Sequence, residues 1–326
     1  MAANPLLTVE TLAVRIPASR GLVSLVREVD FTLERGDILG IVGESGSGKS
    51  LTALAIMGLL PERAVASGRV RFEGEDLLAA SEERLCRLRG DRIAMVFQEP
   101  MTALNPVQTV GAQIAESLVL HRGMAESAAL AEAERLIDRV RLPEPRSRLA
   151  QYPHQLSGGQ RQRVMIAIAL ACAPDILIAD EPTTALDVTV QAQILDLIHD
   201  LVEDSGMALI LISHDLGVIY DVTDRVLVMY AGRVVESGPT VELYERRGHP
   251  YTAALFGALP RAGVARGSRL VAIPGTVPEP SSLAKGCAFA DRCRLAIEPC
   301  RAGEPPWHAL GTDHRALCLR AGENAP

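Results

Sequence analysis

The sequence predicts an α/β fold built on a mostly parallel, buried sheet, and three observations support this class. Short apolar runs of strand type alternate with helix-type segments between residues 175 and 236. A block of helical periodicity from Val110 to Leu142 interrupts the alternation, and antiparallel strands precede it. Past residue 240, closely spaced prolines and glycines break up regular structure. We therefore expect an antiparallel β subdomain, an α/β core, a helical insert and a small irregular C-terminal extension.

The expected elements follow in chain order. Strands are predicted over residues 6–9, 12–16, 29–33, 37–42, 68–78 (with a turn) and 92–97. The helical block 110–142 has a break at Gly123, and the remaining pattern predicts a helix over 158–173, a strand over 175–180, a helix over 189–204, and strands over 208–213, 225–230 and 232–236.

Composition narrows the class of protein. The chain has 326 residues, of which 48% are hydrophobic, enough for one large domain and a smaller appendage. Residues 1–240 hold 22 basic and 32 acidic side chains, whereas residues 241–326 hold 11 and 8, so the main domain is acidic and a nucleic-acid partner is not expected. The longest apolar stretch is too short for a membrane span, and the N-terminus lacks the layout of a secretion signal. We expect a cytoplasmic protein that reaches a membrane only through a partner.

A glycine-rich octet follows the strand predicted over 37–42. Only two of the 33 basic residues are lysines, and one of them, Lys49, lies in this octet, where a compact ammonium is favoured over a planar guanidinium. The pattern G-x-x-x-x-G-K-[ST] is that of the P-loop, whose backbone N–H groups and lysine bind nucleotide phosphates. The pattern predicts a helix over Ser50 to Met57, so a helix N-terminus would face the anion. The predicted nucleotide-binding residues are Gly43, Glu44, Ser45, Gly46, Ser47, Gly48, Lys49, Ser50 and Leu51.

Two acids end a later apolar strand. Asp180 is placed to hold Mg²⁺ through water while Ser50 supplies its hydroxyl to the same ion. Glu181 would lie nearer the γ-phosphate and could polarise the attacking water as a general base. The alternative at this stage is a strand capped by solvated acids.

The segment Leu156-Ser157-Gly158-Gly159-Gln160 opens a helix, with Ser157 as the candidate N-cap and two glycines that would let the backbone approach an anion. Here the chain resembles the ATP-binding-cassette (ABC) family, whose signature is LSGGQ. The resemblance implies a P-loop NTPase fold of ABC type, with an ATPase domain over residues 1–240, a helical insert over about 99–160, and an extension over 241–326. It also implies ATP as the nucleotide and a signature segment, Ser157 to Gln160, that acts on a second subunit's nucleotide.

Other positions match the family's pattern residue by residue. Gln98 resembles the glutamine that contacts Mg²⁺ and the attacking water, so the implied Mg²⁺ ligands are Ser50, Gln98 and Asp180. Asp187, in Thr184-Ala185-Leu186-Asp187, resembles the residue that faces the partner subunit, and His214 resembles the switch histidine that contacts γ-phosphate. The family usually stacks adenine on an aromatic side chain, but this chain has Ile16 at the matching place, so apolar packing would replace stacking.

Longer segments resemble the ATPases of oligopeptide and dipeptide permeases. They are Phe97 to Pro106, Tyr152 to Leu156, His249 to Leu255 and Ile273 to Pro278. This resemblance implies a subunit on the cytoplasmic face of the inner membrane that powers peptide uptake. Its partners would be two transmembrane permease subunits docked on residues 99–150, a second ATPase subunit (a paralogue, otherwise a second copy) and, indirectly, an extracytoplasmic solute-binding protein.

Four cysteines cluster in the extension: Cys287, Cys293, Cys300 and Cys318. Thiols grouped in a cytoplasmic protein favour metal or cluster ligation over disulfides. The intervals of five, six and seventeen residues between them exceed the CxxC pairs of zinc ribbons. Members of the peptide-permease subfamily can carry a [4Fe–4S] cluster at matching cysteines, so the resemblance implies such a cluster. Zinc and free or disulfide-bonded thiols remain the alternatives.

Three other functions are weighed against peptide import. The same ATPase role could serve nickel, glutathione or another small solute, because selectivity belongs to the permease and the binding protein. A non-transport ABC ATPase is disfavoured by the acidic main domain, the single cassette and the permease-type extension. A small-molecule kinase with a P-loop would have no use for the LSGGQ segment.

Overall fold

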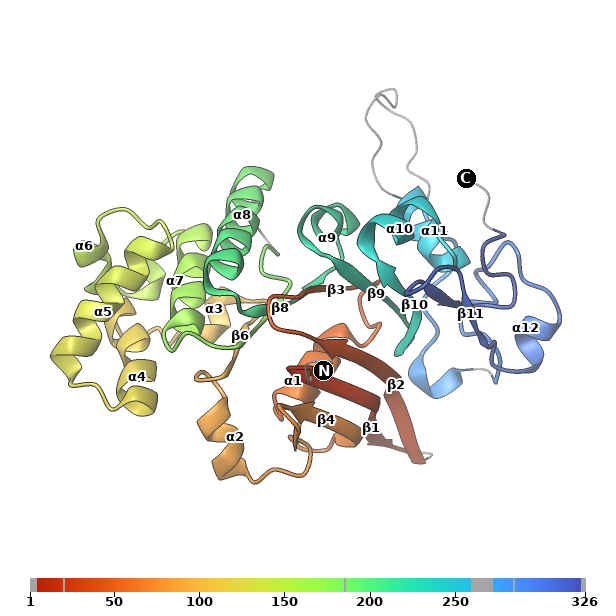
Figure 1. Ribbon diagram of the computed structural model, residues 1–326, viewed down its shortest axis with the longest axis horizontal. Coiled ribbons are helices and arrows are strands. Elements are labelled where there is room, and N and C mark those ends of the chain that lie inside the picture. The colour runs from red at the N-terminus through yellow and green to blue at the C-terminus, as the bar shows by residue number, and fades with distance from the viewer. Residues whose placement is uncertain (1–4, 20, 185, 259–271, 284, 324–326) are drawn as a thin grey trace. The chain divides into compact units, whose positions relative to one another are not determined.

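A computed structural model describes residues 5–19, 21–184, 186–258, 272–283 and 285–323 (Figure 1). The chain forms two compact units, each made of segments that are discontinuous in sequence. The insert unit comprises Leu33–Asp37 and Ala79–Ile212 with the described end of Met1–Leu6. The P-loop unit comprises Leu7–Thr32, Ile38–Leu78 and the described part of Ser213–Pro326.

The P-loop unit contains an antiparallel sheet of strand order β2-β1-β4-β5. Its strands are β1 (Leu7–Ala18), β2 (Gly21–Leu33), β4 (Val65–Phe72) and β5 (Glu75–Asp76). Two early strands were predicted over 6–9 and 12–16, and this was wrong: they are one strand with a register shift between Glu10 and Ala13. Thr11 lies at the shift with φ 46°, so one extra residue bulges out and the pairing with β4 resumes beyond it.

Further strands of the same unit surround the P-loop. The strand β3 (Ile38–Val42) runs parallel to β9 (Arg225–Tyr230), and β10 (Arg233–Pro239), β12 (Arg315–Leu317) and β11 (Trp307–Ala309) continue in antiparallel fashion. All five residues of β3 are buried. Gly40 lets the helix α9 (Leu216–Val222) pack on β3, because a Cβ there would stand 2.7 Å from Ile219 Cγ2. The other helices of this unit are α1 (Lys49–Ile56), α10 (Thr240–Glu245), α11 (Pro250–Gly257) and α12 (Pro299–Ala302), with a 3₁₀ turn at Pro280–Ser282.

The extension is tied to β10 by a buried carboxylate. Glu236, which is fully buried, accepts hydrogen bonds from the backbone N–H groups of Gly248 (2.6 Å) and His249 (2.7 Å). It also bonds to Nε2 of the buried His314, at 2.8 Å. A carboxylate with three partners is stable away from water, so the segments at 248 and 314 are fixed to the sheet.

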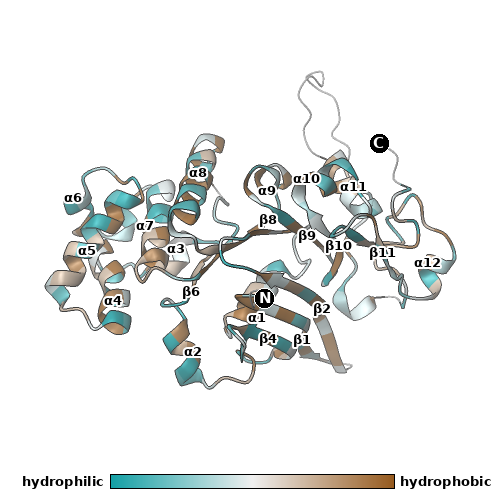
Figure 2. Cartoon of the chain, in the orientation of Figure 1, coloured by the Kyte–Doolittle hydropathy of each residue, from teal (hydrophilic) through white to brown (hydrophobic). Residues whose placement is uncertain are grey.

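The insert unit has a parallel sheet of β6 (Ile93–Val96), β7 (Ile176–Asp180) and β8 (Ala208–Ser213). Figure 2 shows apolar residues along β6 and β8, and β7 is buried throughout, as the continuous apolar runs predicted. Its helices are α2 (Glu82–Leu88), α3 (Pro100–Ala103), α4 (Val110–Arg122), α5 (Glu126–Arg139), α6 (Pro145–Leu149), α7 (Gly158–Leu170) and α8 (Val188–Ser205), with a 3₁₀ turn at Pro153–Gln155. No helix among the described residues is both long and apolar enough to span a bilayer.

Local sequence signals mark where helices end and begin in the insert unit. The predicted break at Gly123 is confirmed: α4 ends there in the left-handed conformation that glycine adopts readily. The helix α2 was not predicted, although Ser81 accepts a hydrogen bond from the N–H of Arg84 and two acids occupy its first turn. That Ser-Glu-Glu pattern was the signal for a helix start.

Candidate functional site

The P-loop lies against the end of β9 so closely that its first glycine is required. A Cβ on Gly43 would stand 2.2 Å from the carbonyl oxygen of Met229, and its φ of 155° suits glycine alone. At the other end of the loop, Gly48 has φ 100°, and the carbonyl of Ser47 accepts a hydrogen bond from Gly232 N–H at 3.0 Å. Ser45 and Gly46 are exposed at the tip. The loop therefore presents its tip to solvent while both ends are fixed.

Lys49 is bonded to the loop that it follows. Its side chain is buried, and Nζ donates to the carbonyl oxygens of Gly43 (2.8 Å) and Glu44 (3.1 Å). These bonds hold the ammonium across the loop at the N-terminus of α1, where both the lysine charge and the helix dipole favour an anion. Ser50 and Leu51, the next residues of α1, are half-buried.

Glu181 has the most constrained backbone of the predicted catalytic residues. Its φ of 46° lies in the left-handed region, which costs a non-glycine residue about 1–2 kcal/mol. Its Oε2 accepts hydrogen bonds from Nε2 of Gln98 (3.1 Å) and Oγ1 of Thr184 (2.9 Å). Two donors on one oxygen fix the rotation of the carboxylate. The sequence had not singled out Thr184 as a partner of this acid, although the short spacing of three residues made the contact possible.

Asp180 ends β7 and is 5% exposed. It pairs with Ile212 of β8, whose carbonyl accepts the N–H of Glu181 at 2.9 Å. The strand pairing thus places both acids at the carboxyl edge of the sheet, where ligands of parallel α/β sheets bind. Within the insert unit the structure brings Asp180, Glu181 and Gln98 to one place.

The signature segment forms a capping box at the start of α7. Ser157 Oγ accepts the N–H of Gln160 (3.3 Å), and Oε1 of Gln160 accepts the N–H of Ser157 (3.0 Å), so the predicted N-cap is confirmed.

The two signature glycines differ in what surrounds them within the chain. Beyond the predicted approach to an anion, Gly159 has a packing role, because a Cβ there would stand 2.6 Å from Cγ1 of Val190 in α8. A Cβ on Gly158 would make ordinary contact with Leu186, at 3.4 Å. Gly159 is therefore required by helix packing within this chain.

The remaining predicted residues are divided between the two units. Asp187 is exposed and caps α8 by accepting the N–H of Val190 at 3.0 Å; Ala185, in the same segment, lies outside the described residues. His214 is exposed and directly follows β8, and the adjacent Asp215 caps α9. Ile16 is half-buried near the end of β1. The P-loop, His214 and Ile16 thus belong to the P-loop unit, whereas Gln98, the signature segment, Asp180, Glu181 and Asp187 belong to the insert unit.

The four clustered cysteines line one small cavity in the extension. Burial, with a smaller contribution from the nearby thiolates, raises the pKa of the Cys318 thiol to about 11. Burial also raises the pKa of Cys287 and of Cys293, with the neighbouring thiolates adding to both shifts. The charged forms of these thiols thus disfavour one another. Among the described residues, no three His, Cys, Asp or Glu side chains are grouped so that they could hold a single metal ion.

His249 lines the same cavity and leaves a donor unpaired. Its Nδ1 accepts the N–H of Tyr251 at 3.0 Å, so the ring proton of the neutral form is on Nε2. Burial lowers the pKa of His249 to about 4, which keeps the ring neutral at physiological pH. Nε2 is buried and has no hydrogen-bond partner among the described residues.

Comparisons with known proteins agree with this geometry. Residues 26–184 match the model of the ABC transporter family, and residues 235–300 match that of the oligopeptide/dipeptide transporter C-terminal region. Among solved structures, a dimeric ATP-binding cassette in a post-hydrolysis state, bound to ADP and Pi, is 28% identical with a TM-score of 0.65 and covers 72% of this chain and 98% of its own.

Curated relatives extend the likeness to the whole chain. A putative peptide import ATP-binding protein of Brucella abortus is 48% identical over 100% of both chains. The oligopeptide transport ATP-binding protein OppD of Salmonella typhimurium is 47% identical over 98% of this chain and 95% of its own. OppD of Mycobacterium tuberculosis is 50% identical over 97% of this chain, which spans only 52% of that relative's length.

The fold and the site define a nucleotide-binding cassette of the P-loop class, as predicted from the sequence. The chain belongs to the family of ABC transporter ATP-binding proteins, in the branch that carries the oligopeptide/dipeptide transporter C-terminal region.

The packing role of Gly159 leads to a stability prediction. Alanine in place of glycine stabilises a helix interior by about 1 kcal/mol, but overpacking against the stiff Val190 side chain costs about 1–3 kcal/mol. Gly159→Ala is expected to lower the free energy of unfolding, and adding Val190→Ala should reverse the loss. The matched control is Gly158→Ala, which should not destabilise the protein. Chemical denaturation of wild type and the three variants provides the measurement, and a Gly159→Ala protein as stable as wild type would contradict the packing account.

Proposed function

We propose that this protein is the ATP-hydrolysing subunit of an ABC importer that takes up di- or oligopeptides. Residues 1–240 would form the ATPase domain, with the helical insert over about 99–160, and residues 241–326 the extension. The observation that carries the proposal is the 48% identity to a peptide import ATP-binding protein over the full length of both chains. The match of residues 235–300 to the peptide-transporter extension supports the same substrate class.

Different residues of the chain are assigned to phosphate binding, Mg²⁺ ligation and proton transfer. The P-loop N–H groups and Lys49 would bind the phosphates, and Ser50, Gln98 and Asp180 supply the oxygen ligands that Mg²⁺ prefers. Mg²⁺ would neutralise charge on the β- and γ-phosphates. Glu181 would accept the proton of the attacking water, with its carboxylate oriented by Gln98 and Thr184. His214 would contact the γ-phosphate from the end of β8, and Ile16 would pack against the base.

The signature segment is proposed to act on the nucleotide of a second ATPase subunit, either a paralogue or another copy of this chain. The backbone at Ser157 and Gly158 is exposed at the N-terminus of the 13-residue helix α7, which favours an anion. Asp187 is exposed beside Val188, which is 83% exposed, so this segment is suited to contact with a partner. A similar solved cassette is described as dimeric.

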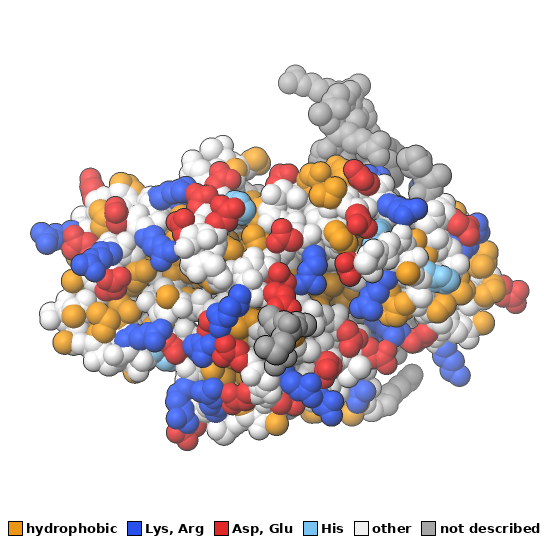
Figure 3. Space-filling view, in the orientation of Figure 1, with side chains coloured by type: hydrophobic (Ala, Val, Ile, Leu, Met, Phe, Trp, Pro, Cys, Tyr) orange, Lys and Arg blue, Asp and Glu red, His pale blue; other side chains and the backbone are white. Residues whose placement is uncertain are grey.

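The docking site for the permease subunits is proposed to be a groove on α4 and α5. Its apolar lining includes Ala112, Val119, Leu120 and Leu130, with Glu116 and Glu126 at its side. Leu120 is 72% exposed, and it adjoins other apolar side chains of the same lining, so these residues form a contiguous apolar patch. Figure 3 shows hydrophobic side chains at the surface over this part of the insert unit. A short amphipathic helix of a permease fits such a groove, and would hold the ATPase at the cytoplasmic face of the inner membrane. The solute-binding protein would act through the permease.

The four thiols of the extension are proposed to hold a [4Fe–4S] cluster. Four cysteines around one cavity are the donor set that such a cluster takes, and iron would relieve the mutual repulsion of their thiolates. The unpaired Nε2–H of His249 at the same cavity would find an acceptor in a cluster sulfide. Bound there, the cluster would cross-link the loops that carry its ligands.

Substitution of the proposed general base tests the ATPase assignment. Glu181→Gln keeps the hydrogen bonds of the side chain but cannot accept a proton, so ATP binding should persist while turnover falls at least about 100-fold. Binding is measured with a fluorescent ATP analogue, and turnover by phosphate release. Glu203→Gln, an exposed acid on α8, is the matched control and should hydrolyse ATP normally.

The same pair of variants tests the cargo. In cells that lack the gene, wild type and Glu203→Gln should restore uptake of a labelled tripeptide, and Glu181→Gln should not. Near-normal ATP hydrolysis by Glu181→Gln would contradict the assignment of Glu181 as the general base. Normal peptide uptake without the gene would instead favour another solute, such as nickel or glutathione, or a non-transport role.

Leu120→Asp tests the docking groove. A charge at the centre of the apolar groove should abolish co-purification with the membrane-embedded subunits, while ATP binding by the isolated chain is retained. Leu22→Asp is the control, since Leu22 is 62% exposed on β2 of the P-loop unit and does not line the groove. If Leu120→Asp still co-purified with the permease subunits at wild-type yield, the groove would not be the docking site.

Metal analysis of anaerobically purified protein tests the thiol site. We expect about four iron and four acid-labile sulfide per chain, with a broad absorption band that chelation removes. Cys318→Ala should lose the iron, whereas Cys86→Ala should keep it, because Cys86 is an exposed thiol of α2 far from the cluster in sequence. Protein that contains neither iron nor sulfide would leave the cysteines without a cluster.

A further inference from the structure

An ion pair joins the cysteine-bearing loop of the extension to the P-loop. Nη1 of Arg292 donates to Oε2 of Glu44 at 2.7 Å, and Nη2 donates to Oε1 at 2.9 Å. Arg292 directly precedes Cys293, and Glu44 is the second residue of the phosphate-binding octet. The arginine side chain is 5% exposed and the glutamate side chain 28%. A bidentate pair this well shielded is geometrically specific and costly to break from one side.

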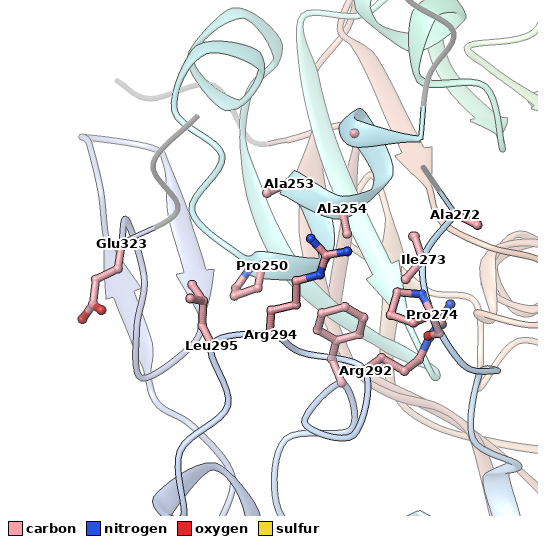
Figure 4. Close-up of a pocket in the computed structure, with 12 residues that line it drawn as sticks. Pro250, Ala253, Ala254, Ala272, Ile273, Pro274, Arg292, Arg294, Leu295 and Glu323 are labelled. Atoms are coloured by element: carbon pink, nitrogen blue, oxygen red, sulfur yellow. The ribbon is translucent and has the colours of Figure 1, made fainter. Parts of the chain in front are cut away.

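The guanidinium of Arg292 is held on its other sides by the same unit. Nε donates to the carbonyl of Pro274 at 2.8 Å, and Nη1 also reaches the hydroxyl of Tyr230 at 3.3 Å. The cation lies 5.9 Å from the ring centroid of Phe289. Figure 4 shows Arg292 directed toward Pro274, in the wall of a pocket that α11 also lines. The arginine is thus fixed in position by residues of the extension and of β9, so its contact with Glu44 has a defined geometry.

A second residue of the extension holds the backbone at the same position. The hydroxyl of Tyr251 accepts the N–H of Glu44 at 2.9 Å. Tyr251 is fully buried and packs on Tyr230 and Phe289, with ring centroids 4.6 and 5.3 Å away. The extension therefore contacts both the side chain and the main chain of Glu44.

Lys49 completes the arrangement from within the P-loop. It donates to the carbonyl oxygen of Glu44, so this one residue is bonded at its N–H by Tyr251, at its side chain by Arg292 and at its carbonyl by the lysine. A shift of Glu44 would move one of the two carbonyls that orient the ammonium. The extension therefore acts on the group that would bind the phosphates.

We propose that Arg292 is a positioning residue of the nucleotide site, through which the C-terminal extension holds the P-loop in its phosphate-binding shape. The proposal rests on the ATP site of the proposed function, but not on the presence of a cluster or on the transported solute. It gives the extension a direct part in nucleotide binding.

Nucleotide affinity in a double-mutant cycle tests this role. Arg292→Ala and Glu44→Gln are each expected to weaken binding of a fluorescent ATP analogue by about tenfold. The double variant should bind no more weakly than the weaker single variant, because both changes remove one interaction. Arg292→Lys keeps the charge but not the bidentate bond, and should fall between wild type and Arg292→Ala.

Controls separate positioning from general stability. Arg294→Ala changes an exposed arginine of the same loop whose side chain points elsewhere in Figure 4, and should bind ATP as wild type does. Melting temperatures identify variants that fold poorly; for these, Glu44→Gln and Arg292→Lys carry the test. Positioning predicts that KM for ATP rises while kcat at saturating ATP changes less, whereas loss of folded protein would lower kcat at constant KM.

Three results would overturn the proposal. They are ATP binding by a folded Arg292→Ala protein within twofold of wild type, an equal loss in Arg294→Ala, or fully additive losses in the double variant. If wild type itself bound no ATP, the nucleotide site would fail, and with it the proposed function. If wild type binds ATP and Arg292→Ala is unaffected, only the positioning role fails.

Discussion

The nucleotide site depends on the close approach of the P-loop backbone to β9. The carbonyl of Met229 occupies the space that any side chain at position 43 would need, so the loop can reach its position only with glycine there. From this fixed point the chain turns through Glu44 and the exposed tip to Lys49, which bonds back to the carbonyls of Gly43 and Glu44. The position of the Lys49 ammonium therefore depends on a backbone contact with β9, a strand about 180 residues further along the chain.

The acidic part of the site depends on strand pairing and on local strain. Asp180 and Glu181 are adjacent, yet the left-handed backbone of Glu181 redirects its carboxylate toward Gln98 and Thr184. Such a conformation persists only where the surroundings impose it, and here the bond from Glu181 N–H to Ile212 does so. Two neighbouring acids thereby acquire different environments, as the proposed roles of one as metal ligand and the other as proton acceptor require.

Local features were predictable from the sequence because their causes lie within a few residues. The cap at Ser157, the stop at Gly123 and the buried strand before the acids are of this kind. Features set by distant contacts were not predictable. Val190 requires glycine at position 159 from 31 residues away, and Arg292 reaches Glu44 across 248 residues. Nothing in the octet itself indicates a salt bridge, since its variable positions tolerate many residues.

The Arg292 contact also determines how the thiol site and the nucleotide site can influence one another. Cys287, Arg292 and Cys293 belong to one short loop, so anything that stiffens the loop at its cysteines restricts the arginine as well. If the proposed cluster stiffens the loop and so strengthens nucleotide binding, thermodynamic linkage requires the nucleotide to strengthen cluster binding by the same factor. Two described routes lead from the cysteine loop to Glu44: the Arg292 ion pair, and Tyr251, which packs on Phe289 of that loop and accepts the N–H of Glu44. Without the Arg292–Glu44 pair the coupling should weaken, because only the route through Tyr251 remains.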